Sequence, residues 1–141
     1  MSISYSTTVA TVGGRNGTAT SDDGRLSLRL AIPRELGGKG EGTNPEQLFA
    51  AGYAGCFGSA VIHVARGREK KIGDGDVEVA ATIGLRQDQE GQFGLTAALI
   101  VTIAGIDQAA AEAIVAEAHR TCPYSRAVRG NVEVALTVRT R

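Results

Sequence analysis

The sequence predicts an α+β fold in a single domain that spans residues 1–141. Short runs with the alternation of β-strands come in groups, two longer runs have helical character, and turn signals separate them. The resulting order is three strands, a helix, two strands, a second helix and a last strand. A chain of 141 residues suits one domain. A domain of this size buries only about two thirds of its unfolded surface, which favours a homodimer that buries more.

The first third of the chain predicts a β-meander. Residues 3–12 alternate apolar and small polar side chains, and residues 18–21 and 26–30 continue the strand pattern. Turn signals lie between them at Gly13-Gly14 and Asp22-Asp23-Gly24. Arg15 directly follows the first of these turns.

A glycine-rich loop, residues 33–43, leads into a helix that we expect to run from position 45 to about position 66. Asn44 can cap this helix, Pro45 suits its first position, and Glu46 favours the positive end of its dipole. Its middle is rich in glycine and alanine, although glycine costs about 1 kcal/mol against alanine in a helix. We therefore expect other backbone to press closely against a buried, central helix.

The second half of the chain predicts two strands, a helix and a final strand. Residues 77–83 alternate as a strand, and after a turn at Glu90-Gly91 residues 93–104 return as a second, more apolar strand. Asp107 is the expected cap of an alanine-rich helix that Cys122-Pro123 ends, and residues 132–138 form the last strand. The expected apolar stripe of this helix is Ile106, Ala110, Ala113, Ile114 and Ala118.

Charge and hydropathy exclude several classes of function. Lysine and arginine total 15, as do aspartate and glutamate, so the chain lacks the basic footprint of a nucleic-acid-binding protein. No stretch approaches the roughly 20 apolar residues that cross a bilayer, and residues 1–14 lack the pattern of a signal peptide. We expect a cytoplasmic protein without a nucleic-acid or membrane partner. In that reducing compartment, two cysteines indicate redox, catalytic or metal chemistry before a structural disulfide.

The two cysteines, Cys56 and Cys122, allow several interpretations when taken alone. Both could be small buried hydrophobic residues, a common role for free cysteine. Together with His63 and His119 they could bind zinc, although their spacing matches no standard zinc finger. Cys56 could also be the nucleophile of a hydrolase with a histidine base, but no third group is found to orient that histidine.

Two longer motifs resemble those of the organic hydroperoxide resistance proteins, within the superfamily named after the osmotically inducible protein C. Residues 43–57, TNPEQLFAAGYAGCF, resemble the cysteine-bearing helix of that family. Residues 119–125, HRTCPYS, followed by GNV at 130–132, resemble its second cysteine motif. Arg15 stands where the family carries an essential arginine. The resemblance spans essentially the whole chain, with minor departures at Gly55 and His63.

The resemblance implies an OsmC-like fold, with antiparallel β-meanders packed around a long central helix in an intertwined homodimer. It implies reduction of organic hydroperoxides through a Cys56 sulfenic acid and a Cys56–Cys122 disulfide. It further implies recycling by a dithiol reductant, a dihydrolipoyl group on a lipoylated protein, without metal or organic cofactor.

The site residues that the resemblance implies also have a physical rationale. A free cysteine has a pKa of about 8.5, so a thiolate on the mid-helix Cys56 needs an outside charge, for which Arg15 is the candidate. Glu46 would hold the planar guanidinium of Arg15 in position. Cys122 lies at a helix C-terminus, where the dipole disfavours a thiolate, and this suits a resolving cysteine.

The positions of Glu46 and Cys56 on the expected helix favour a site shared between two subunits. Ten residues of helix separate two backbones by about 15 Å along the axis and about 80° around it. Either the helix breaks between these residues, or the Arg15–Glu46 pair beside each Cys56 belongs partly to the partner subunit. We expect the second arrangement.

Overall fold

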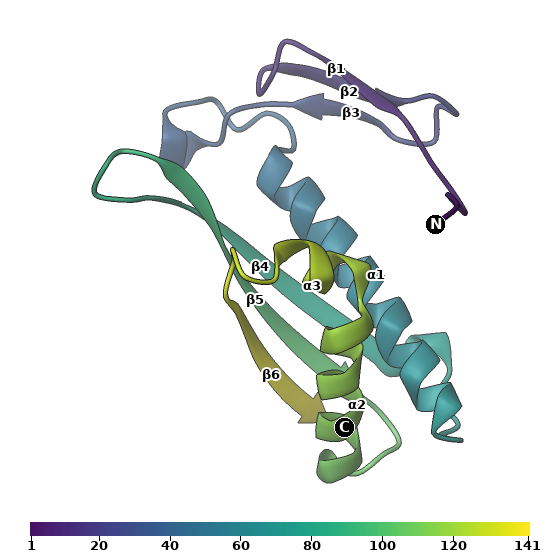
Figure 1. Cartoon of the computed structure of the whole chain (residues 1–141). Helices are drawn as coiled ribbons and strands as arrows, with labels where there is room; N and C mark the ends of the chain where they lie inside the picture. The colour runs from purple at the N-terminus through teal and green to yellow at the C-terminus, as the bar shows by residue number, and fades with distance from the viewer. The chain divides into compact units, whose positions relative to one another are not determined.

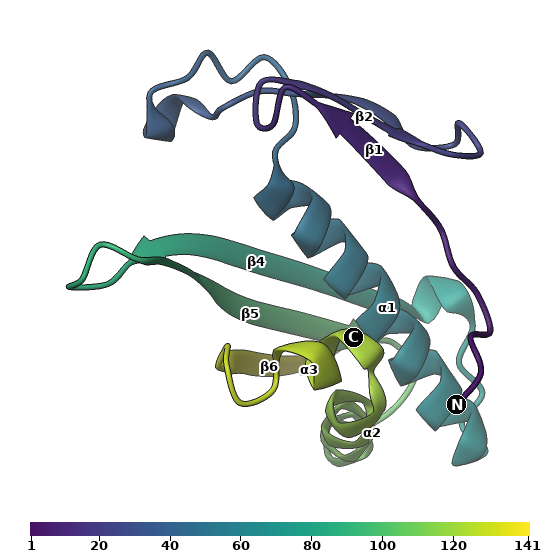
Figure 2. The same cartoon turned by 45° about the horizontal axis from the view of Figure 1, so that its top comes forward.

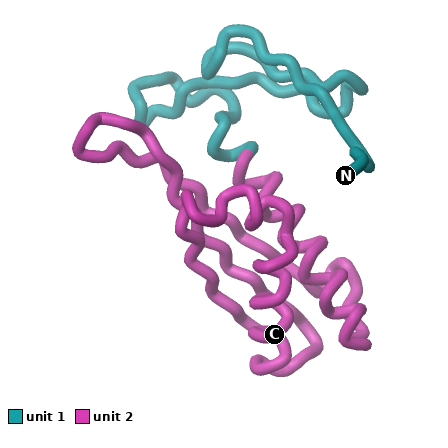
Figure 3. Tube along the Cα trace, viewed as in Figure 1, with its two compact units in different colours: residues 1–48 teal, residues 49–141 magenta.

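The computed structural model describes all residues, 1–141, and they form two compact units (Figure 3). The first unit is Met1–Leu48 and the second is Phe49–Arg141. Helix α1 (Pro45–Gly67) begins in the first unit and continues into the second as one helix. That residues 1–141 act as one domain stays a prediction.

A three-stranded antiparallel sheet forms much of the first unit (Figure 1). Its strands are β1 (Val9–Val12), β2 (Gly17–Ser21) and β3 (Ser27–Leu30), which lie side by side in that order, as the predicted meander requires. The turn between β1 and β2 holds Gly13 at φ +87°. A Cβ atom at position 13 would meet the carbonyl oxygen of Asn16 at 2.5 Å. Glycine is therefore needed at the turn that carries Arg15.

The first strand is shorter than the sequence predicts. Residues 3–8 have the alternation of a strand, but β2 ends at Ser21, which pairs with Val9, so no strand of this chain remains for them to pair with. Ile3 and Tyr5 stay 84% and 79% exposed. The carbonyl of Thr8 still accepts a hydrogen bond from the N–H of Asp22, but residues 3–7 offer unpaired backbone groups and apolar side chains, as an open sheet edge does.

In the second unit, helices lie on one face of a three-stranded sheet (Figure 1 and Figure 2). β4 (Val77–Gln87) and β5 (Phe93–Ile103) are antiparallel, as predicted. β6 (Val134–Thr140) pairs with β5 in parallel, which departs from the predicted antiparallel meander. The connection explains this, because α2 (Gln108–Thr121) and α3 (Pro123–Val128) bring the chain back to the start of β5. Two short 3-10 turns, η1 (Arg34–Leu36) and η2 (Asp74–Asp76), lie in the loops.

Side chains from α1, α2 and β5 form the core of the second unit. Tyr53, Phe57 and Val61 recur every four residues along α1 and are fully buried. They share one apolar cluster with Leu99 on β5 and Ile114 on α2. Full burial of a large apolar side chain contributes about 1.5–3 kcal/mol, so this cluster fixes α1 against the rest of the unit.

The buried face of α2 lies partly away from the predicted stripe. Asp107 caps the helix as predicted, since its Oδ1 accepts a hydrogen bond from the backbone N–H of Ala110 at 2.7 Å. Ile114 and Ala118 are buried as predicted, whereas Ala113 is exposed. The helix buries Ala111, Ile114, Val115 and Ala118.

Helix α3 is absent from the predicted order of elements. Pro123 indicates the end of a helix when it follows a helical run, yet it also suits the first position of a new one. Cys122 therefore lies between two helices and is the residue that both share as a cap.

Helix α1 begins as predicted but is less enclosed than expected. Asn44 Oδ1 accepts a hydrogen bond from the backbone N–H of Gln47 at 2.9 Å. A Cβ atom at Gly52 would meet the ring of Tyr124, and one at Gly55 would meet nothing within 4 Å. The expectation that other backbone presses on these glycines is therefore wrong within this chain.

One stripe of α1 is exposed. Ala51, Gly55 and Ser59 lie four positions apart on it, and all three are open to solvent. By length and composition alone α1 could cross a membrane, so the expectation that no stretch qualifies is wrong. A helix in the core of a soluble protein passes the same test, and the opposite face of α1 packs into the core.

Candidate active site

Cys56 and Cys122 lie side by side in the second unit. Their sulfur atoms are 3.7 Å apart although the residues are 66 positions apart in sequence, and both thiols are free. Because a disulfide bond is about 2.0 Å long, an approach of less than about 2 Å would join them. Cys122 is fully buried and Cys56 is partly exposed.

The helices explain why one cysteine is buried and the other is not. Cys56 precedes the fully buried Phe57, so it lies at the border of the core face of α1. Cys122 follows Ala118 by four positions and continues the buried stripe of α2. The two sulfurs meet where these two faces come together.

The surroundings of Cys56 oppose its ionisation. Burial raises the pKa of the Cys56 thiol, and the neighbouring Cys122 thiol raises it further. The backbone N–H of Tyr124, in the first turn of α3, acts in the other direction and lowers this pKa by hydrogen bonding to the sulfur. Sequence reasoning did not identify this donor, because it belongs to the main chain.

Cys122 has a setting that α2 alone does not describe. It lies at the C-terminal end of α2 and also at the N-terminal end of α3. Helix ends of opposite dipole sign therefore meet at this residue. The sequence-based expectation considered the end of α2 alone, and that end does not describe the whole setting of Cys122.

Arg15 and Glu46 form a bidentate ion pair in the first unit. The Nη1 and Nη2 atoms of Arg15 donate to the two carboxylate oxygens of Glu46 at 2.8 and 2.6 Å. The hydrogen bonds from Arg15 lower the pKa of Glu46, and the same contact raises the pKa of Arg15. The four predicted site residues thus form two pairs. Arg15 and Glu46 pair within the first unit, and Cys56 and Cys122 lie together within the second.

A hydrogen-bonded network, buried at Tyr53 and Ser125 and partly buried at His119, links α1, α2 and α3. The hydroxyl of Ser125 lies 2.6 Å from the hydroxyl of Tyr53 and 2.9 Å from Nδ1 of His119. Burial lowers the pKa of His119 and raises that of Tyr53, and the positive charge of Arg129 also lowers the pKa of His119. His119 is thus a hydrogen-bonding residue, and sequence reasoning did not identify the roles of Tyr53 and Ser125 in this network.

Aromatic rings line this part of the second unit. Phe49, Tyr53 and Tyr124 contact one another with ring centroids 5.9 to 6.3 Å apart. Cys56 and Phe49 pack against the apolar cluster that contains Tyr53. A ligand at the Cys56 sulfur would therefore meet mainly apolar surface.

The alternative chemistries find no support in the arrangement. No group of three or more His, Cys, Asp or Glu side chains lies close enough together to hold a metal ion. His63 is exposed, and His119 is engaged with Ser125 and makes no hydrogen bond with either cysteine. The nucleophile–base pair of a cysteine hydrolase is therefore not formed.

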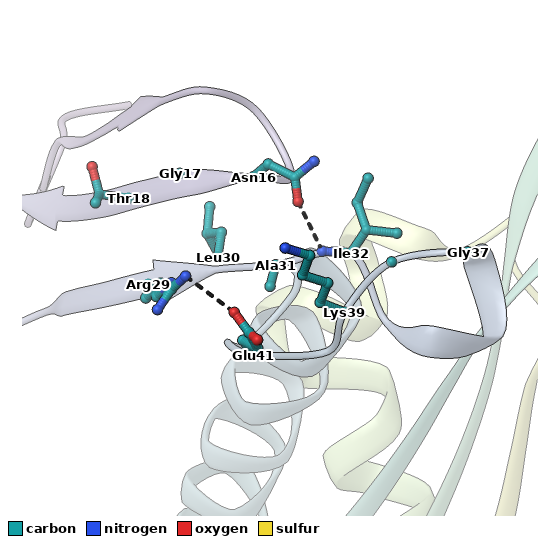
Figure 4. Close-up of a pocket in the computed structure, with 11 residues that line it drawn as sticks. Asn16, Gly17, Thr18, Arg29, Leu30, Ala31, Ile32, Gly37, Lys39 and Glu41 are labelled. Carbon is teal, nitrogen blue, oxygen red and sulfur yellow. Dashed lines mark hydrogen bonds and ion pairs between the residues drawn. The ribbon is translucent and has the colours of Figure 1, made fainter.

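A separate pocket of about 680 Å³ lies in the first unit (Figure 4). Arg29 donates to Glu41 at 3.4 Å across it, and the backbone N–H of Ile32 donates to Asn16 Oδ1 at 3.2 Å. Its lining contains neither cysteine nor histidine, so it is not the candidate active site.

Comparison with known proteins gives consistent matches. The family model described as OsmC-like protein matches residues 38–137. The organic hydroperoxide resistance protein of Xanthomonas axonopodis pv. citri is 45% identical over 135 residues, which cover 95% of this chain and 94% of that protein. The organic hydroperoxide resistance protein OhrB of Bacillus subtilis is 42% identical, with coverages of 96% and 98%. The crystal structure of an organic hydroperoxide resistance protein from Legionella pneumophila has a TM-score of 0.93 at 50% identity, covering 98% of this chain and 99% of that one.

The Arg15–Glu46 pair predicts how the free energy of unfolding varies with pH. The folded-state pKa of Glu46 lies below its unfolded value of about 4.3. The pair therefore stabilises the protein above the unfolded pKa, and this contribution is lost as the pH falls through the folded pKa. For a partly exposed pair it amounts to about 1 kcal/mol or less. We expect Glu46→Gln to lower the free energy of unfolding at pH 7 by this amount and to match the wild type in strong acid.

Denaturant titrations at pH 7 and at about pH 2 measure this difference. Glu41→Gln is the control, because Glu41 pairs with Arg29 at 3.4 Å and both side chains are more than half exposed, at 56% and 69%. Equal destabilisation by Glu46→Gln at both pH values would contradict the ionic origin of the effect.

Proposed function

The chain belongs to the OsmC-like family and, within it, to the organic hydroperoxide resistance proteins, and on this premise we propose that it reduces organic hydroperoxides with Cys56 and Cys122. The observation that carries the proposal is the 3.7 Å separation of a partly exposed and a fully buried thiol. A peroxidase of this kind needs an accessible thiol to attack the peroxide and a protected second thiol to complete the disulfide.

The proposed reaction has two chemical steps. The Cys56 thiolate attacks one peroxide oxygen, the O–O bond breaks, and the alkoxide takes up a proton and leaves as the alcohol, which leaves a sulfenic acid on Cys56. The Cys122 sulfur then attacks the Cys56 sulfur, the S–O bond breaks, and the hydroxyl group leaves as water with the proton of Cys122. One hydroperoxide and two thiols thus give one alcohol, one water and one disulfide, without metal or organic cofactor.

Arg15 supplies the charge that the first step needs. Burial raises the pKa of Cys56, and the Tyr124 N–H is the one hydrogen bond that opposes this effect. A guanidinium near the sulfur would stabilise the thiolate and the negative charge on the departing oxygen. Glu46 would orient that guanidinium through its two hydrogen bonds.

The substrate class follows from the apolar surroundings of Cys56. Phe49 and Tyr124 contact each other edge to face, and Tyr124 is 39% exposed. Such a surface favours alkyl or lipid-like hydroperoxides over small polar peroxides. For recycling we propose a dithiol reductant, a dihydrolipoyl group on a lipoylated protein, which reduces the disulfide and is itself oxidised to a disulfide. The cytoplasm is the compartment in which we place this cycle.

We also propose a homodimer in which two chains share each active site. Helix α1 is unbroken from Pro45 to Gly67, so the alternative of a break between Glu46 and Cys56 is wrong. Two exposed surfaces could contact a partner subunit: the unpaired segment at residues 3–7 and the exposed stripe of small residues on α1. Small side chains on the stripe would allow close approach of a second α1.

Counting thiols tests the function directly. We expect the reduced protein to lose two thiols per chain within one turnover with tert-butyl hydroperoxide. Cys56→Ser should abolish this reaction, whereas Cys122→Ser should complete one turnover and stop with an over-oxidisable sulfenic acid on Cys56. Thiol titration and intact mass measure both outcomes. Loss of single-turnover reduction in Cys122→Ser alone would reverse the two roles.

Replacing Arg15 should affect the chemistry more than the fold. We expect Arg15→Ala to raise the pKa of Cys56 and to slow peroxide attack by about 100-fold, the scale seen when one preorganised donor is removed. Thiolate absorbance against pH and stopped-flow peroxide consumption measure the two effects. Arg25→Ala is the matched control, because Arg25 lies in the next turn of the same sheet and its side chain is 89% exposed. An unchanged thiol pKa and rate in Arg15→Ala would remove Arg15 from the mechanism.

A mixed dimer tests whether the site is shared. Arg15→Ala and Cys56→Ser chains are unfolded together and refolded. If Arg15 serves the Cys56 of its partner, the mixed dimer contains one intact site, and we expect about half of the wild-type activity per mixed dimer. If each chain uses its own Arg15, the mixture stays as inactive as its components, and the proposal is contradicted. A monomer that sediments as such and is fully active would also contradict it.

A further inference from the structure

We propose that Ser125 is a positioning residue that holds Cys122 against Cys56 while the disulfide forms. The inference rests on the function proposed above and adds Ser125, with Tyr53 and His119, to the residues on which the second chemical step depends. None of these three side chains reacts, and each acts through the placement of the two sulfur atoms.

The spacing of the three residues carries the argument. Tyr53 precedes Cys56 by three positions on α1, and His119 precedes Cys122 by three positions on α2. Ser125 follows Cys122 by three positions and lies on α3. Three positions make about one helical turn, so both hydrogen bonds of Ser125 lie about one turn away from the sulfur pair. A single hydroxyl thus ties together the three helices that carry or flank the two cysteines.

Cys122 needs such a tie because it is not held inside a regular helix. Its backbone, at φ −59° and ψ 125°, leaves the helical region between α2 and α3. Helix α3 has only six residues, too few to be stable by itself. The direction in which the chain leaves Cys122 is therefore set by what anchors α3, and Ser125 and Val128 are its only buried residues.

The hydrogen bond between Tyr53 and Ser125 lies in the core, where an unpaired hydroxyl would be energetically unfavourable. Tyr53 and Ser125 are both 0% exposed, and no buried polar side-chain atom lacks a partner. Burying a hydroxyl is unfavourable unless it is hydrogen-bonded, and phenylalanine and alanine would fill the same space without that requirement. What the polar pair adds to an apolar core is direction, since a hydrogen bond accepts only a narrow range of distances and angles.

The same anchor also affects the ionisation of Cys56. Tyr124 directly precedes Ser125, and its backbone N–H lowers the pKa of the Cys56 thiol. A movement of the first turn of α3 would therefore displace this N–H group together with the Cys122 thiol. Both the stabilisation of the Cys56 thiolate and its later capture by Cys122 depend on one short segment.

Single-turnover kinetics of purified full-length variants test the proposal. Ser125→Ala removes both hydrogen bonds, and we expect it to slow the conversion of the Cys56 sulfenic acid to the disulfide about tenfold or more, as misplaced reacting groups do. Tyr53→Phe keeps the ring and the Ser125–His119 bond, and we expect a slowing of about threefold. With a tenfold excess of tert-butyl hydroperoxide, both variants should divert more Cys56 to sulfinic acid, which intact mass detects. Ser125→Ala should also raise the pKa of the Cys56 thiol.

Asp107→Ala is the control for a loss of stability alone. It removes the N-cap of α2, at the end of the helix opposite Cys122, and should lower the Tm while leaving the rate of disulfide closure and the sulfinic acid yield unchanged. Ser125→Thr retains a hydroxyl and should restore the closure rate at least in part.

The possible outcomes are distinct. Closure at the wild-type rate in Ser125→Ala would overturn the proposal, even if its Tm were lower. If that variant does not fold, Tyr53→Phe decides: slower closure supports the proposal, and an unchanged rate overturns it. If the wild-type protein itself forms no disulfide with peroxide, the proposed function fails, which is a different result from an unaffected variant of an active enzyme.

Discussion

The packing of α1 against α2 over strand β5 determines where the reactive groups of the second unit lie. Tyr53, Phe57 and Val61 form the buried face of α1, and the stripe of α2 that ends at Cys122 joins the same core cluster. Removing a large side chain from such a core costs about 2–5 kcal/mol, so the alignment of the two helices is strongly fixed. The sulfur atoms of Cys56 and Cys122 come into contact as a consequence of this alignment.

Local signals in the sequence were sufficient where the chain interacts only with its near neighbours. The caps at Asn44 and Asp107 bond to backbone groups three positions away, and the turn at Gly13 closes onto Asn16. These features depend on short-range sterics and hydrogen bonds that each residue type favours by itself. The strands of the β4–β5 hairpin and the start of α1 were predicted for the same reason.

Long-range features could not be predicted in this way. Tyr53 and Ser125 are 72 positions apart, and no local pattern indicates that their hydroxyls meet. The parallel pairing of β6 depends on the path that α2 and α3 take, and the donor at Tyr124 is a main-chain group without a side-chain signal. Arg15 and Glu46 became candidates through the family resemblance, because an arginine in a turn and a carboxylate in a first helical turn are common on any surface.

If the protein is recycled by a dithiol as proposed, the unequal exposure of the two sulfurs would set the order of events. A dithiol arriving from solvent can reach only the sulfur of Cys56, since Cys122 is fully enclosed. Thiol–disulfide exchange depends on which sulfur is accessible to the attacking thiolate. In the proposed cycle the incoming dithiol would therefore become attached to Cys56, and Cys122 would be the leaving group, released back into the core. The second thiol of the reductant would then detach it, without any need for the buried sulfur to reach the surface.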